Sequence, residues 1–92
     1  MSIRPNINYI IRWTPLIIAA SAGHIAICRY LLEHGAAVNS VTDQGRSALL
    51  YACSKNHDDV AKLLLDRHAD INLQDKYGSS PLHRAASTGH VK

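Results

Sequence analysis

The chain has 92 residues, of which 47% are hydrophobic and 18% are charged, and its formal net charge is +3. It is too apolar for a disordered segment, yet no apolar run approaches the roughly 18 residues needed to span a bilayer. The basic residues alternate with acidic ones, so no continuous basic stripe could follow a phosphate backbone. We therefore expect no nucleic-acid partner and no membrane partner.

The first residues show no regular pattern. Ile3, Ile7, Ile10 and Ile11 do not form a recognisable helix pair, and the stretch lacks the apolar region and cleavage site of a secretory signal. We expect residues 1–12 to form an irregular N-terminal arm.

From residue 13 onward, the sequence repeats with a period of 33 residues. The anchor strings at 13–16, 46–49 and 79–82 share this interval, and histidines, leucines, alanines and asparagines further along keep the same register. A period of this length is typical of ankyrin repeats, each of which is one helix pair with a loop.

The chain thus resembles the ankyrin-repeat family. The resemblance implies an all-α solenoid of helix-turn-helix units with hairpin-like loops, about two and a half repeats long. The repeats are expected at 13–45 and 46–78, with a truncated repeat, inner helix only, at 79–92. Because the ends lack the polar caps usual in such arrays, we expect a fragment or an incomplete gene model.

The first repeat is expected to contain an inner helix at 15–22 and an outer helix at about 25–34. Thr14 can cap the inner helix, and Pro15 sits where a missing N–H costs nothing. In the outer helix, Ile27, Leu31 and Leu32 form one apolar stripe. The outer helix should end at Gly35, since glycine tolerates the left-handed conformation of that position.

The second repeat copies the first, with Ser47 as cap and Val60, Leu63 and Leu64 on the outer stripe. Its outer helix ends at His68 instead of glycine, so this turn is either differently shaped or mildly strained.

Turn residues fill 39–46 and 72–79, where Gly45 and Gly78 predict two projecting, hairpin-like loops. We call these loops the two fingers.

The third inner helix is expected at 81–88, after the cap Ser80. With no outer helix to cover it, Leu82, Ala85 and Ala86 should be exposed, and an exposed apolar patch favours self-association through the uncapped ends.

Cysteines and histidines give no sign of a reactive centre. Cys28 and Cys53 fall in different repeats without C-x-x-C spacing, so we expect reduced thiols and a cytoplasmic and nuclear location. His24, His57 and His90 lie one repeat apart, about 10 Å by the spacing of packed helices, too far to share one ion. No catalytic constellation or phosphate-binding loop is present, and we expect no metal, no cofactor and no enzymatic activity.

Function is therefore expected on residues that packing does not dictate, at the fingers and on the open face of the inner helices. Trp, Tyr and Arg often anchor protein interfaces, and clustered basic residues attract an acidic partner. These residues form the predicted binding surface: Trp13, Asp43, Gln44, Arg46, Tyr51, Lys55, Lys76, Tyr77 and Arg84.

A narrower resemblance is carried by non-consensus strings, Ser-Lys-Asn at 54–56 and His-Arg-Ala-Ala at 83–86. They are similar to the ankyrin-repeat chaperones of proteasome assembly. That resemblance implies a concave face that binds the C-terminal domain of a proteasomal ATPase. The 33-residue period alone equally allows a generic ankyrin-repeat adaptor with another protein client.

Overall fold

The computed structural model describes residues 13–88, which form five α-helices joined by loops. The helices are α2 (Pro15–Ala22), α3 (Ile25–Glu33), α4 (Ala48–Ser54), α5 (Asp58–Asp66) and α6 (Pro81–Thr88). The expected all-α solenoid is confirmed. The predicted arm at 1–12 and the last residues, 89–92, lie outside the described part. All the predicted repeat boundaries stay predictions.

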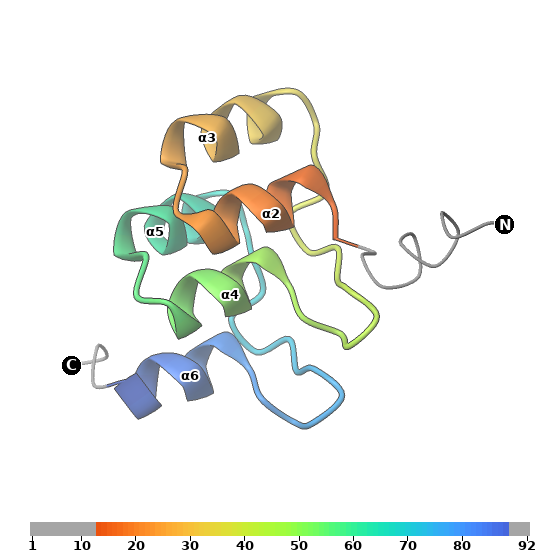
Figure 1. Ribbon diagram of the computed structural model, residues 1–92, viewed down its shortest axis with the longest axis vertical. Helices are drawn as coiled ribbons and strands as arrows, with labels where there is room; N and C mark the ends of the chain where they lie inside the picture. Colours follow the sequence, from red (N-terminus) through yellow and green to blue (C-terminus); the bar gives the residue numbers. More distant parts are fainter. Residues whose placement is uncertain (1–12, 89–92) are drawn as a thin grey trace, which may run out of the picture.

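The inner helices α2, α4 and α6 lie side by side in one layer, and the outer helices α3 and α5 form a second layer against them (Figure 1). Between the layers, Ile17 of α2, Leu49 of α4 and Leu64 of α5 are almost completely buried. Each repeat therefore buries its apolar face partly within its own helix pair and partly against its neighbour.

Each inner helix begins at the predicted cap. The hydroxyl oxygens of Thr14, Ser47 and Ser80 each accept a hydrogen bond, at 3.2 Å, from the backbone N–H three residues later. These bonds satisfy N–H groups that have no partner within the helix, so local sequence alone fixes where α2, α4 and α6 start.

The turns after the two outer helices have the same shape, although only one contains glycine. Gly35 has a φ of 89° and His68 a φ of 71°, and the N–H groups of Ala36 and Ala69 both donate to a leucine carbonyl at 3.0 Å. A histidine in the left-handed region is strained, because its Cβ approaches the following carbonyl. Of the two alternatives predicted for this turn, mild strain is therefore correct.

The two fingers are closed by equivalent contacts. In the first, the N–H of Gly45 donates to the carbonyl of Thr42 at 2.8 Å, and in the second the N–H of Gly78 donates to the carbonyl of Asp75 at 3.1 Å. Both glycines have positive φ values, as the turn geometry requires.

The apolar stripe predicted on α3 is only partly right. Leu31 and Leu32 pack half-buried against the core, but Ile27 is 50% exposed and Cys28 is buried in its place. Helix α3 packs against α2 and α5 with Cys28 in the core, while half of the Ile27 surface stays open. On α5 the predicted stripe is confirmed.

The exposed edge predicted on α6 is present. Leu82 is 43% exposed and Ala86 is exposed, whereas Ala85 is half-buried because it lines an apolar groove beside α5 together with Leu65 and Ile71. The exposure predicted for Ala85 is therefore only partial. The self-association expected from this edge stays a prediction.

Candidate functional site

The first group in the predicted binding surface is an aromatic pair that joins two repeats. The rings of Trp13, just before α2, and Tyr51, in α4, lie with centroids 4.6 Å apart and planes tilted by 35°. Both side chains are half-buried. Such a tilted pair adds to the stability of the stack.

The second group is centred on Arg46, which ties the two fingers together. Its Nε donates to Oδ2 of Asp75 at 3.2 Å, and its Nη1 donates to the side-chain oxygen of Gln44 at 3.0 Å. The guanidinium also lies 5.7 Å from the centroid of the Tyr77 ring. A backbone bond from Lys76 N–H to the Gln44 carbonyl, 2.9 Å long, joins the same two loops.

Asp75 anchors this network and was not among the residues predicted from the sequence. Its Oδ1 accepts hydrogen bonds from the N–H groups of Tyr77 and Ser79, both at 2.9 Å, and its side chain is completely buried. Burial acts to raise the pKa of Asp75. The hydrogen bonds from Ser79 and Tyr77 and the contact with Arg46 outweigh it, so this pKa lies below its ordinary value.

The 33-residue repeat could have pointed to the role of Asp75 in closing the second finger. The equivalent residue of the first finger, Thr42, is also buried, and its hydroxyl oxygen accepts from the N–H groups of Gln44 and Arg46, both at 3.3 Å. A short polar side chain three residues before a finger glycine therefore closes the finger in both repeats. Only Asp75 adds a charge, and that charge holds Arg46.

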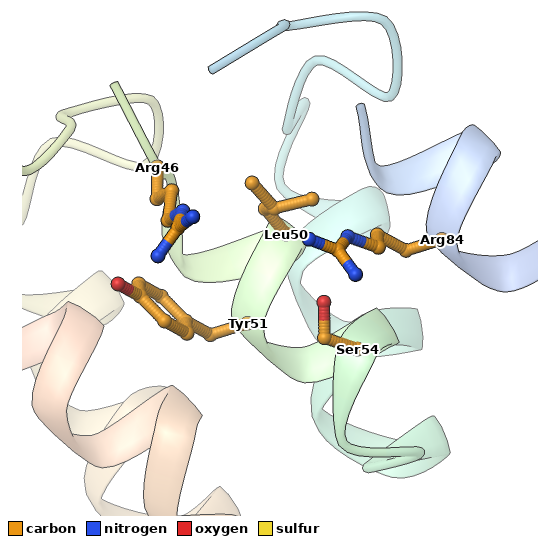
Figure 2. Close-up of a pocket in the computed structure, with 5 residues that line it drawn as sticks. All are labelled: Arg46, Leu50, Tyr51, Ser54 and Arg84. Atoms are coloured by element: carbon orange, nitrogen blue, oxygen red, sulfur yellow. The ribbon is translucent and has the colours of Figure 1, made fainter. Parts of the chain in front are cut away.

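A pocket of about 170 Å³ opens between α4 and α6, beside the fingers. Figure 2 shows its lining: Arg46 and Tyr51 on one side, Arg84 and Ser54 on the other, and Leu50 between them. Three of these residues belong to the predicted binding surface. Leu50 and Ser54 were not in that set.

The remaining predicted residues lie outside this pocket. Lys55 at the end of α4 donates from Nζ to the hydroxyl of Ser21 in α2 at 2.7 Å, so it bridges two inner helices. Asp43 and Lys76 are exposed on the fingers. Tyr77 is 70% exposed, which leaves most of its ring open to a partner.

The histidine and cysteine contacts fit structural roles. The Nε2 of His57 lies 3.1 Å from the carbonyl oxygen of Ser21, which links the loop before α5 to α2. Cys28 is buried and Cys53 half-buried, and both are free. Burial, followed by the nearby carboxylates of Asp59 and Asp58 respectively, raises the pKa of each thiol, so both stay uncharged at neutral pH.

Two other features are absent from residues 13–88. No group of three or more His, Cys, Asp or Glu side chains there could hold a metal ion. None of the helices in that range is long and apolar enough to cross a membrane.

Stacked helix pairs with projecting fingers, presenting aromatic and basic side chains beside a polar pocket, define a repeat scaffold for binding proteins. A family model described as ankyrin repeats, in three copies, matches residues 2–75. The chain therefore belongs to the ankyrin-repeat family and is a protein–protein interaction module. No curated protein matches the chain.

Proposed function

We propose that the chain resembles gankyrin in function as well as in its local strings. In this proposal it is a non-catalytic chaperone for assembly of the 26S proteasome regulatory particle, and its predicted binding surface holds the C-terminal domain of one base ATPase. It would act where it meets that client, in the cytoplasm and the nucleus.

One observation carries this proposal. The two non-consensus strings, at 54–56 and 83–86, are about thirty residues apart in the sequence, yet Ser54 from the first and Arg84 from the second line the same pocket. Residues that depart from the ankyrin consensus and meet on one open surface are explained more simply by a shared partner than by packing.

Part of the first string has a structural explanation. Asn56 has a φ of 63°, at the position where the first repeat has Gly23, and asparagine is one of the few residues that tolerate this conformation. The proposal therefore rests on Ser54, Lys55 and Arg84 and not on Asn56.

Charge reversal on the binding surface tests the proposal. Arg46 is unsuitable, because its replacement would also break the contact with buried Asp75. The double variant Lys55→Glu and Arg84→Glu is the cleaner choice, because the one internal side-chain bond it removes, from Lys55 to the Ser21 hydroxyl, leaves no buried charge unpaired. Loss of two positive charges from the interface should slow association with the purified ATPase domain and reduce its salt dependence.

The matched control is Arg29→Glu with Lys62→Glu, an equal charge change on exposed residues of the outer helices α3 and α5. It should bind like the unchanged chain. A folded double variant at Lys55 and Arg84 that binds as fast as this control would refute the proposed site.

The alternative is an ankyrin-repeat adaptor with another protein client, which the family membership equally allows. Recovery of partners from a cell lysate separates the two. Enrichment of a proteasomal ATPase supports the chaperone, whereas enrichment of other proteins without proteasome subunits supports the adaptor.

A further inference from the structure

The two arginines of the pocket differ in the hydrogen bonds that their guanidinium groups make. Arg46 is already satisfied within the chain, since it donates to the Asp75 carboxylate and to Gln44. Arg84 is not. Its Nε is buried and has no hydrogen-bond partner among the described residues.

A buried donor without a partner is unusual in a folded protein, because it loses its bonds to water and gains none in return. The effect is larger when the donor belongs to a charged group. A rotation of the Arg84 side chain that exposes Nε to the pocket would let a ligand with a suitable acceptor supply the missing bond.

The surroundings of Arg84 select the kind of acceptor. Its guanidinium lies across the pocket, with the hydroxyl of Ser54 facing it and the side chain of Leu50 beside it (Figure 2). The Nε and a neighbouring terminal nitrogen of a guanidinium form a fork that matches the two oxygens of a carboxylate. Ser54 can donate a third hydrogen bond.

The charge of the pocket limits the ligand further. Asp75 offsets the charge of Arg46, which leaves Arg84 as the one uncompensated positive group among the pocket residues. A single negative charge on an apolar stem fits better than a run of phosphates, since Leu50 and the Tyr51 ring would contact the stem.

We propose that this pocket binds one carboxylate of a partner protein, through a forked pair of hydrogen bonds from Arg84 and a third from Ser54. This inference rests on the proposed function only in that the surface is a protein-binding one, and it adds the chemistry that the partner must supply. The carboxylate comes from an acidic side chain or from a chain terminus.

Three capped or free peptides distinguish the sources. The first has a central glutamate with both ends blocked, the second has glutamine at that position with both ends blocked, and the third has the glutamine but a free C-terminus. The readout is the Nε–H signal of Arg84 in the NMR spectrum of the full chain, followed during titration with each peptide.

We expect the glutamate peptide to shift this signal and the blocked glutamine peptide to leave it in place. A shift caused by the free C-terminus would identify a chain terminus as a second source. If neither carboxylate moves the Arg84 signal, or if inorganic phosphate alone moves it, the inference is wrong.

Variants supply the second test. Arg84→Gln should weaken binding of the responsive peptide by about tenfold or more, and Arg84→Lys, which keeps the charge but lacks the fork, should weaken it by a smaller factor. Arg29→Gln on the outer helix α3 is the control. Because Arg84 makes no bond through Nε within the described chain, Arg84→Gln should also leave the melting temperature unchanged or raise it. Unweakened binding by a folded Arg84→Gln chain would overturn the inference.

The same variants separate this inference from the proposed function. Binding of the ATPase domain that does not depend on Arg84 would refute the carboxylate pocket and leave the chaperone standing. If the carboxylate peptide shifts the Arg84 signal but the chain binds no proteasomal ATPase, the carboxylate pocket stands and the chaperone function is refuted.

Discussion

The outer helices α3 and α5 occupy the same register of the repeat, but their side chains have different surroundings. Ile27 of α3 is 50% exposed, while Val60, the equivalent residue of α5, is completely buried. Leu31 and Leu64 are a second such pair, half-buried and fully buried. The amino acids are nearly the same in each pair, so the difference lies in the neighbours.

The difference follows from how a repeat array is built. Helix α5 packs against α4 of its own repeat and also, on its side toward the first repeat, against α3. The same side of α3 meets no preceding helix pair within residues 13–88. In a stack of this kind, burial is a property of a position in the array and not of a sequence motif.

The largest effect is expected when the same substitution is made at two equivalent leucines, one in each outer helix. Leu64→Ala should lower the free energy of unfolding by about 2 to 5 kcal/mol, because it leaves a cavity in the core. Leu31→Ala removes the same atoms from a half-buried site, and its effect should be less than half as large. Denaturant unfolding of both variants measures the difference. Equal effects would show that the neighbouring helix does not determine burial.

The next prediction concerns Asp75, since the equivalent residue of the first finger, Thr42, carries no charge. Its pKa is lower in the folded chain than the value of about 3.9 expected when unfolded, so its charge stabilises the fold above that pH. This stabilisation is lost as the pH falls through the folded-state pKa. Asp75→Asn should therefore lower the free energy of unfolding by about 1 to 3 kcal/mol at pH 7.

The pH dependence identifies the cause. The gap between the Asp75→Asn chain and the unchanged chain should shrink as the pH falls below about 4, because Asp75 then becomes uncharged too. A gap that stays constant down to pH 2 would mean that the carboxylate charge does not hold the fingers together.

The smallest effects are expected from substitutions in the two turns that follow α3 and α5. His68→Gly should raise the free energy of unfolding by about 0.5 to 1 kcal/mol, since relief of the left-handed strain exceeds the entropy that glycine loses on folding. Gly35→Ala should have the opposite sign, although a Cβ at this position would meet nothing within 4 Å. Thermal unfolding of both variants checks the signs, and a destabilising His68→Gly would rule out strain.

Local features of this fold could be predicted from the sequence because they depend on a few adjacent residues. Thr14, Ser47 and Ser80 cap their helices through bonds that span only three residues. Gly45 and Gly78 mark turns that require positive φ. The 33-residue register then transferred each local prediction from one repeat to the next.

Contacts between repeats were harder to predict. The bond between Arg46 and Asp75 joins residues 29 positions apart, and it forms only because the fingers pack in the order set by the helices. The sequence marked Arg46 as open to a partner, whereas the structure uses much of it to join the fingers. The unpartnered Nε of Arg84 likewise depends on how Ser54 and Leu50 face it. Ile27 was misjudged for a related reason, because its pattern matches Val60 but its neighbours do not.

We propose that partners bind the fingers and the open face of the inner helices, opposite the outer layer. Hydrogen exchange of the full chain, measured with and without the C-terminal domain of a proteasomal ATPase, tests it most directly. We predict slower exchange in the fingers at 39–46 and 72–79 and in α4 and α6, with α3 and the exposed side of α5 unchanged. Protection confined to α3 and α5, with the fingers unaffected, would contradict it.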